Sequence, residues 1–175
     1  MIIKKSPKLG LLKIFPKTNF KDFRGSYLEA FNKKNYKKIL KVDFVEDDFT
    51  INKQNVFRGI HGDHKTWKLV SCVYGKCEAI IVNWNKKSKY FGLWERFILS
   101  PHDYFQILIP PSHGNSFLVL SKVAVYHYKQ TQYYQGQTRQ FTLNYKDPFF
   151  KIKLSIENPI LSKRDLNAMF VEDNI

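Results

Sequence analysis

Between residues 69 and 129 the chain repeats one pattern: short runs of apolar and aromatic residues, each followed by turn-forming residues. Ser100-Pro101, Pro110-Pro111 and Gly114-Asn115 interrupt the runs, and Gly75-Lys76 joins two runs as in a hairpin. Several short strands at this spacing are typical of an antiparallel sandwich or barrel. We therefore expect strands at residues 69–74, 77–84, 91–99, 104–109, 116–120 and 124–129.

Helical patterns are scarce outside this region. Residues 35–40 allow one or two turns, and Ser162 followed by Asp165 three residues later is a variant of the capping-box signal for a helix start. No repeat or low-complexity linker divides the chain. The sequence predicts one all-β domain over residues 1–175, with a few short helices.

The formal net charge is +14. Most of the basic residues are lysines scattered along the chain, which is typical of a solvated surface, although a phosphate-bearing small substrate would also be attracted by such a field. A basic module that binds nucleic acid is the alternative from a different functional class. We expect neither nucleic acid nor a membrane as a partner.

Cys72 and Cys77 are the two cysteines, so the chain has no disulfide framework, and a reducing compartment fits. The first residues lack the apolar run of a signal peptide, and no stretch approaches the roughly 20 apolar residues of a transmembrane helix. We expect a cytoplasmic protein.

Histidines and tyrosines gather in two segments. Alternation along residues 123–129 places Tyr126 and Tyr128 on one face of a strand and His127 on the other. In an extended strand, Arg58 would likewise lie on the face opposite to His61.

A three-histidine metal site formed by His61, His64 and His113 is a possible interpretation. A spacing of three residues places His61 and His64 on opposite faces of a strand, and no carboxylate closely follows His64. We therefore expect no bound metal. Nucleophilic catalysis has little support, because neither cysteine is close in sequence to a histidine.

Ordered motifs between about residues 20 and 168 resemble one known family. The matching segments are Asp22-Phe23-Arg24-Gly25 with Glu29, Arg58-Gly59-Ile60-His61, Lys68-Leu69-Val70, residues 88–94, Pro110 with His113-Gly114, Tyr126-His127-Tyr128-Lys129, Tyr133-Tyr134, Asp147-Pro148 and residues 160–165. Together they resemble the dTDP-4-dehydrorhamnose 3,5-epimerases, a branch of the cupin barrels. The resemblance implies a cupin, or jelly-roll, β-barrel.

The resemblance also implies roles for individual residues. His61 matches the base that removes a proton next to the ketone of a 4-keto sugar, and Asp165 matches its carboxylate partner. Lys68 matches the cation that stabilises the enolate, and Tyr128 matches the acid that returns a proton from the opposite face. Histidine suits the first role because it titrates near neutral pH. The substrate-binding positions are Arg24, Glu29, Arg58, His113 and Tyr134.

The implied function is epimerisation at C3, C5 or both of a nucleoside-diphosphate 4-keto-6-deoxy sugar, without a cofactor, for surface polysaccharide biosynthesis. Arg-Gly-Ile-His-Gly-Asp at residues 58–63 resembles the branch that acts on GDP-linked heptoses, so the nucleotide is GDP or dTDP. A 4-keto sugar isomerase on the same barrel is the alternative enzyme. The resemblance further implies a homodimer in which the N-terminal segment contributes to the partner's site.

Overall fold

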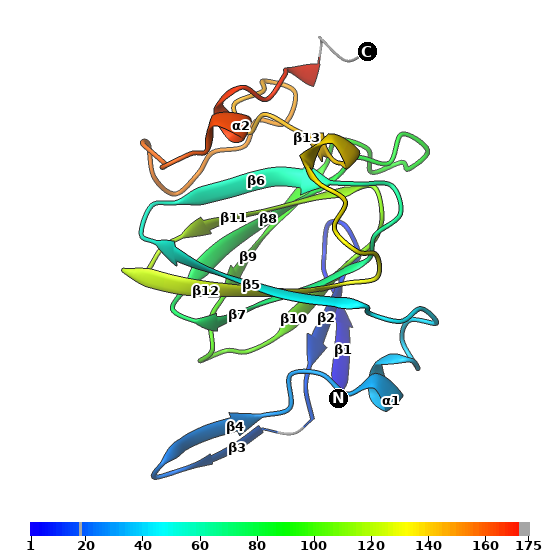
Figure 1. Cartoon of the computed structure of the whole chain (residues 1–175), viewed down its shortest axis with the longest axis vertical. Coiled ribbons are helices and arrows are strands. Elements are labelled where there is room, and N and C mark those ends of the chain that lie inside the picture. Colours follow the sequence, from blue (N-terminus) through cyan, green and yellow to red (C-terminus); the bar gives the residue numbers. More distant parts are fainter. Residues whose placement is uncertain (18, 172–175) are drawn as a thin grey trace.

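The structure, a computed structural model, describes residues 1–17 and 19–171 and contains two antiparallel β-sheets packed against each other (Figure 1). One sheet has six strands, in the order β1 (Ile2–Lys5), β2 (Leu12–Phe15), β10 (Gln106–Ile109), β7 (Lys68–Tyr74), β12 (Val123–Gln130) and β5 (Glu46–Lys53). The other has five strands, in the order β13 (Phe141–Thr142), β6 (Phe57–Gly62), β11 (His113–Val119), β8 (Cys77–Asn83) and β9 (Trp94–Leu99).

A core of alternate side chains fills the space between the two sheets. Along β8, Cys77, Ala79 and Ile81 belong to this core, whereas Ile80 and Val82 face the other side of their sheet. A strand covered on both faces has few polar positions, and every residue of β8 is buried. The continuous apolar run at residues 79–82 thus reflects coverage of both faces.

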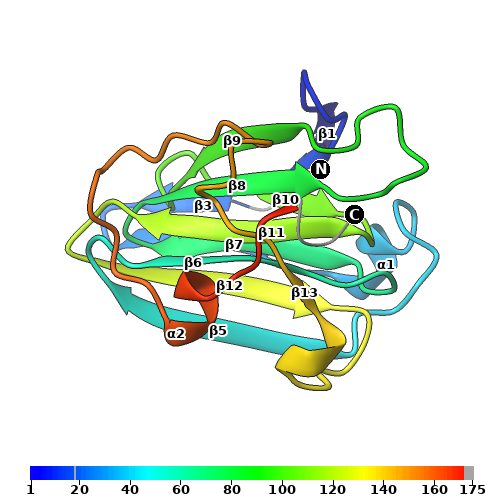
Figure 2. The same ribbon diagram turned by 90° about the horizontal axis from the view of Figure 1, so that it is seen from above.

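Irregular C-terminal chain covers the outer face of the five-stranded sheet. Leu143, Tyr145 and Phe150 pack there against Ile80 and Leu118. Seen from above, this segment crosses the sheet and leads into the helix α2 (Lys163–Leu166) (Figure 2). The 3-10 turn η1 (Gln137–Arg139) comes just before β13. The C-terminal segment is therefore part of the folded body and can supply residues to a site on β6.

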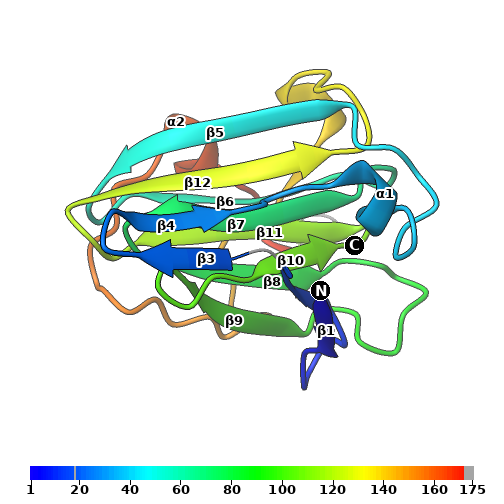
Figure 3. The same ribbon diagram turned by 90° about the horizontal axis from the view of Figure 1, so that it is seen from below.

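The six-stranded sheet carries the N-terminal elements on its outer side. The helix α1 (Lys33–Tyr36) packs through Tyr36 against Ile14, Leu69 and Leu108. The hairpin β3 (Asn19–Asp22) and β4 (Gly25–Leu28) extends away from the two sheets (Figure 1), and in the view from below it lies in front of them (Figure 3). Phe23 at its tip is 98% exposed, so none of the described residues covers it.

The structure confirms the all-β prediction, with two α-helices of four residues each in the described part of the chain. All six strands expected between residues 69 and 129 exist, with ends shifted by one to three residues. The strands before residue 62 were not predicted. The expected helix start at Ser162 is confirmed, because its side chain accepts a hydrogen bond from the backbone N–H of Asp165.

No helix among the described residues is long and apolar enough to cross a membrane.

Candidate active site

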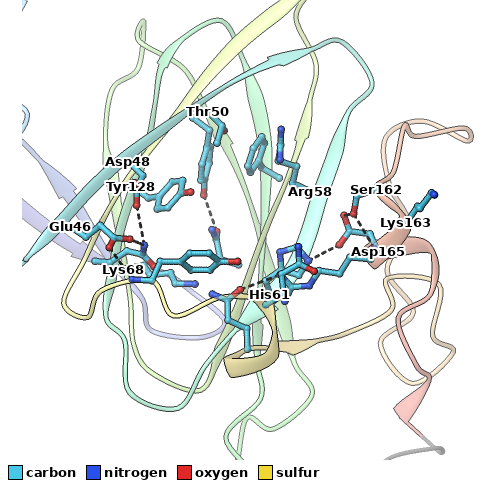
Figure 4. A pocket seen from close by; sticks show the side chains of 18 residues that line it. Glu46, Asp48, Thr50, Arg58, His61, Lys68, Tyr128, Ser162, Lys163 and Asp165 are labelled. Carbon is cyan, nitrogen blue, oxygen red and sulfur yellow. Dashed lines mark hydrogen bonds and ion pairs between the residues drawn. The ribbon is translucent and has the colours of Figure 1, made fainter.

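A cavity of about 580 Å³ lies between the sheets at the end formed by β5, β6 and β12, beside α2 (Figure 4). Six residues predicted for the site line it: Arg58, His61, Lys68, Tyr128, Tyr134 and Asp165. The other lining residues are Glu46, Asp48, Thr50, Asn115, Phe117, Tyr126, Gln130, Gln137, Gln140, Ser162, Lys163 and Arg164.

Strand pairing explains how residues from three strands meet at this cavity. Lys68 of β7 is opposite Gln130 of β12, and Gln130 is opposite Glu46 of β5. Two residues further along, Tyr128 is opposite Asp48. Because side chains two apart on a strand point the same way, these residues form two neighbouring inward-facing rows.

Alternation along β12 holds as predicted. Tyr126 and Tyr128 line the cavity, whereas His127 and Lys129 point outward and both bind the carboxylate of Asp47. The ring of Tyr126 stacks on Phe117 with 4.0 Å between ring centres, and its hydroxyl donates to Asn115. Tyr126 is therefore fixed in the wall.

Alternation along β6 does not hold, and the expected opposition of Arg58 and His61 is wrong. Arg58 pairs with Phe117 of β11 and His61 pairs with Asn115, so three steps along β6 match two steps along β11. The extra residue forms a β-bulge, which changes the direction of the side chains that follow. As a result both Arg58 and His61 line the cavity.

His61 forms a close pair with Asp165. Nε2 of His61 lies 2.6 Å from Oδ1 of Asp165, and the hydroxyl of Ser162 donates to the other carboxylate oxygen at 2.7 Å. Burial alone would raise the pKa of Asp165, but the hydrogen bonds with His61 and Ser162 outweigh it and lower the pKa below its ordinary value. Asp165 therefore stays ionised and holds the hydrogen on Nε2, which leaves Nδ1 of His61 as the basic nitrogen.

Lys68 presents an uncompensated charge to the cavity. Its side chain is almost wholly buried, and it makes no hydrogen bond or ion pair with any residue that the structure describes. Burial is the main cause that lowers the pKa of Lys68, and the positive charge of Arg164 adds to it, while Asp63 opposes. A buried ammonium without a partner is costly, so this position indicates a ligand that carries negative charge or a polarised oxygen.

Tyr128 also has a free polar group. Its hydroxyl has no hydrogen-bond partner within the described ranges, and it faces the cavity. Burial raises the pKa of Tyr128, as does the carboxylate of Asp48, while Arg58 opposes them. The phenol is therefore held in the protonated form, which is the form that can give up a proton.

Three of the predicted substrate-binding residues lie elsewhere. His113 is buried at the start of β11, and its Nδ1 donates to the carbonyl oxygen of Pro111 at 3.0 Å. Burial lowers the pKa of His113, against the effect of that hydrogen bond. Arg24 and Glu29 lie on and just after the β3–β4 hairpin, where Arg24 pairs with Asp22 at 2.6 Å. None of the three lines this chain's own cavity.

The two histidines of the alternative metal site separate. His61 faces the cavity, whereas His64 bonds to the hydroxyl of Ser112 and lines a smaller neighbouring cavity of about 320 Å³. Across residues 1–17 and 19–171 the structure brings together no three His, Cys, Asp or Glu side chains with the geometry of a metal site. The absence of a required metal remains a prediction.

Sequence reasoning missed Glu46, Asp48, Gln130 and Arg164. The run Glu46-Asp47-Asp48 departs from the Gln-Asp-Asn that the resembling family often carries, but this departure assigned no residue to the cavity. The period of two along a strand could have identified Glu46 and Asp48 as residues on one face, but only the pairing of β5 with β12 shows that this face is the inner one.

A two-sheet barrel with this cavity at one end belongs among the cupin-type isomerases that act on nucleotide-linked sugars. The sequence profile described as dTDP-4-dehydrorhamnose 3,5-epimerase matches residues 8–173. The chain belongs to this family.

Similar proteins cover almost the whole chain. The dTDP-4-dehydrorhamnose 3,5-epimerase of Salmonella typhimurium is 35% identical over 178 residues, which cover 98% of this chain and 96% of that protein. The dTDP-6-deoxy-D-glucose-3,5-epimerase of Legionella pneumophila, solved with dTDP-4-keto-L-rhamnose, is 32% identical with a TM-score of 0.90, covering 98% of this chain and 93% of that one. The enzyme of Elizabethkingia anophelis is 30% identical with a TM-score of 0.87, covering 99% and 97% of the two chains.

Proposed function

We propose that this protein epimerises C3, C5 or both of a nucleoside-diphosphate 4-keto-6-deoxy sugar, without a cofactor. The observation that carries the proposal is the pair of His61 and Asp165 at 2.6 Å in a cavity that also contains the unpaired Lys68 and Tyr128. Each of these groups has the chemistry that one step of the reaction requires. The names of the relatives support the class of substrate.

The first step is removal of a proton from the carbon next to the ketone. Nδ1 of His61 takes this proton, because Nε2 is already bound to the carboxylate of Asp165. The ring becomes a cation, and the ionised Asp165 stabilises it by charge as well as by its hydrogen bond.

The second requirement is stabilisation of the enolate. Proton removal places negative charge on the C4 oxygen, and Lys68 supplies a fixed positive charge inside a buried site. The enolate also gives Lys68 a partner that it lacks within residues 1–17 and 19–171. This interaction is stronger in the transition state than with the neutral ketone, so it accelerates the reaction.

The last step returns a proton to the other face of the same carbon. Tyr128 supplies it, because its hydroxyl is protonated, makes no hydrogen bond with the part of the chain that the structure describes, and is directed into the cavity from β12. His61 and Tyr128 come from different sheets, so the sugar ring can lie between them. Before the next turnover His61 releases its proton to solvent, and the phenolate of Tyr128 takes one up from solvent, so both groups return to their starting forms.

The identity of the substrate is a finer part of the proposal. The names of the relatives favour a dTDP-linked sugar, whereas residues 58–63 resemble the branch that uses GDP-linked heptoses, in surface polysaccharide biosynthesis. Arg58 and Lys163 are cations suited to a diphosphate. Cys72 and Cys77 remain free thiols, which supports the proposed cytoplasmic location.

We also propose a homodimer in which Arg24 and Glu29 complete the partner's cavity, and His113, at the start of β11, stays a predicted substrate-binding residue. The exposed aromatic residues of the hairpin, Phe20, Phe23 and Tyr27, support an interface on this side.

The experiment is incubation with GDP- and dTDP-linked 4-keto-6-deoxy sugars in heavy water, read by NMR. We expect deuterium at C3, C5 or both, with inversion of configuration. Movement of the ketone to another carbon would identify an isomerase instead. No exchange with either nucleotide series would contradict the proposal.

A further inference from the structure

Glu46 and Asp48 form one side of the cavity and have no role in the proton transfers. Both point inward from β5, whereas Asp47 between them points outward. In Figure 4 they lie across the cavity from Ser162, Lys163 and Asp165. They introduce negative charge into a cavity that is proposed to hold a diphosphate, and this charge needs an explanation.

Hydrogen bonds hold the two carboxylates in place. Nε2 of Gln130 donates to Oε1 of Glu46 at 2.9 Å and to Oδ2 of Asp48 at 3.1 Å, and the backbone N–H of Tyr134 donates to Oε2 of Glu46 at 2.9 Å. Gln130 is only 5% exposed, so this arrangement is built into the wall. Oδ1 of Asp48 has no hydrogen-bond partner in the part of the chain that the structure describes, and it is available to a ligand.

The carboxylates do not serve to neutralise Lys68. Gln130 lies between Lys68 and Glu46 across the three strands, and no ion pair joins Lys68 to either carboxylate. The cavity thus contains the buried, unpaired ammonium of Lys68, which is 6% exposed. The carboxylates of Glu46 and Asp48 lie beside it and also face the cavity. Both features indicate that a ligand supplies the missing partners.

The chemistry of the pair restricts what it can contact. Ionised carboxylates only accept hydrogen bonds, so they bind hydroxyl groups well and repel phosphate oxygens. We propose that Glu46 and Asp48 form a hydroxyl-binding subsite of the substrate cavity, an inference that rests on the proposed function. The diphosphate then lies across the cavity, near Arg58 and Lys163.

Two parts of a sugar nucleotide carry suitable hydroxyls: the sugar being epimerised and the ribose of a ribonucleotide. The ribose offers neighbouring 2′- and 3′-hydroxyls, which a carboxylate can bind together, whereas deoxyribose lacks the 2′-hydroxyl. Carboxylates would bind the hydroxyls of the ribose and those of the sugar in the same way. Ligands that differ in one of these two parts are therefore needed to tell which part is bound.

The experiment measures binding by calorimetry for wild type, Glu46→Gln and Asp48→Asn, with Asp47→Asn as the matched control. The ligands are GDP, 2′-deoxy-GDP, GDP-mannose and dTDP-glucose, which are stable because they have no ketone. A hydrogen bond to a charged group is worth about 1.5–3 kcal/mol, so each site variant should bind the hydroxyl-bearing ligand roughly 10- to 100-fold more weakly. Asp47→Asn should bind like wild type.

The pattern across ligands identifies the source. If the ribose is bound, wild type prefers GDP to 2′-deoxy-GDP and the site variants lose that preference. If the sugar is bound, the variants weaken GDP-mannose and dTDP-glucose but bind GDP normally. If a variant folds poorly, the relative affinities of the wild-type protein for the four ligands still test the hydroxyl-binding subsite.

Two other outcomes would overturn the inference. Unchanged binding by both variants would show that the carboxylates do not touch the ligand. Tighter binding of all four ligands would show that they face the diphosphate and repel it. If wild type still incorporates deuterium into a 4-keto sugar, the proposed function survives either result; if wild type neither binds nor exchanges, both proposals fail.

Discussion

A β-carbon added to Gly59 would lie 2.5 Å from Cβ of Ser116, so β6 and β11 touch at this point. Gly59 also has a φ of +120°, which L-residues with side chains rarely adopt. The close contact lies inside the bulge that brings Arg58 and His61 to one cavity.

Gly59→Ala should therefore destabilise the fold and disturb the site. Strain at such a φ and overpacking each cost about 1–3 kcal/mol, so we expect a total loss of roughly 2–6 kcal/mol in the free energy of unfolding. Gly136→Ala is the matched control, since Gly136 has a φ of +90° with nothing within 4 Å of an added β-carbon. Urea unfolding of both variants gives the comparison; equal losses would contradict the importance of the strand contact.

Tyr128→Phe should separate proton removal from inversion. The variant keeps the shape of the cavity and loses only the unpaired hydroxyl, so His61 and Lys68 can still form the enolate. Deuterium should then enter mostly without inversion. The measurement is the ratio of exchange to inversion by NMR; a wild-type ratio would assign proton delivery to another group, with Tyr134 on the same wall the next candidate.

His61→Asn should abolish exchange at every carbon, because proton removal precedes all other steps. The loss should reach at least the roughly 10²–10⁴-fold that a general base contributes. Gln137→Ala alters another lining residue without removing a titrating group and serves as the control for the cavity. Normal exchange in His61→Asn would show that another group is the base.

Asp165→Asn should reduce turnover and change the acid stability of the protein. The folded state lowers the pKa of Asp165 below 3.8, so the ionised carboxylate stabilises the fold above about that pH, and this contribution is lost as the pH falls through the lowered pKa. Asp165→Asn removes that contribution. We expect a flatter dependence of unfolding free energy on pH below about 3.8; an unchanged slope would place the acid sensitivity elsewhere.

Lys68→Met should lose activity and gain stability. At neutral pH the buried ammonium has no hydrogen-bond or ion-pair partner among the described residues, and burial lowers its pKa, so the fold disfavours its charge. An apolar side chain of similar length removes this cost, and we expect a gain of about 1 kcal/mol or more in unfolding free energy. Exposed Lys53→Met controls for the general effect of removing a positive charge.

The alkaline limb of the pH–rate profile gives a second view of Lys68. Activity needs the ammonium form and should fall as the pH rises through the lowered pKa, which is below 10.5. In Lys68→Arg any remaining activity should persist to higher pH, because guanidinium stays protonated. An identical alkaline limb in this variant would mean that Lys68 does not control it.

The sequence predicted best where one strand or turn determines the geometry. Ser162 and Asp165 are three residues apart, and their hydrogen bonds are local, so the helix start was readable. The inward face of β12 followed from alternation, because β12 has no bulge at Tyr126–Gln130. The ordered motifs predicted the family, which local patterns alone could not have done.

Prediction failed where a neighbouring strand determines the geometry. The bulge in β6 exists because β11 takes two steps where β6 takes three, and no count of residues along β6 alone shows this. Glu46 and Asp48 needed the register with β12, formed by residues about 80 positions later. The roles of Arg24, Glu29 and His113 stay predictions, because they lie outside this chain's cavity.

The pairing of His61 with Asp165 also has a consequence for the order in which the protein matures. During synthesis His61 leaves the ribosome 104 residues before the carboxylate that orients it. All strands of the two sheets are complete by residue 142, yet Asp165 reaches the site only when the irregular C-terminal chain has packed over the outer face of β6 and β8. A chain in which this segment has not docked lacks the carboxylate that orients His61, so full turnover requires the C-terminal chain to be packed in place.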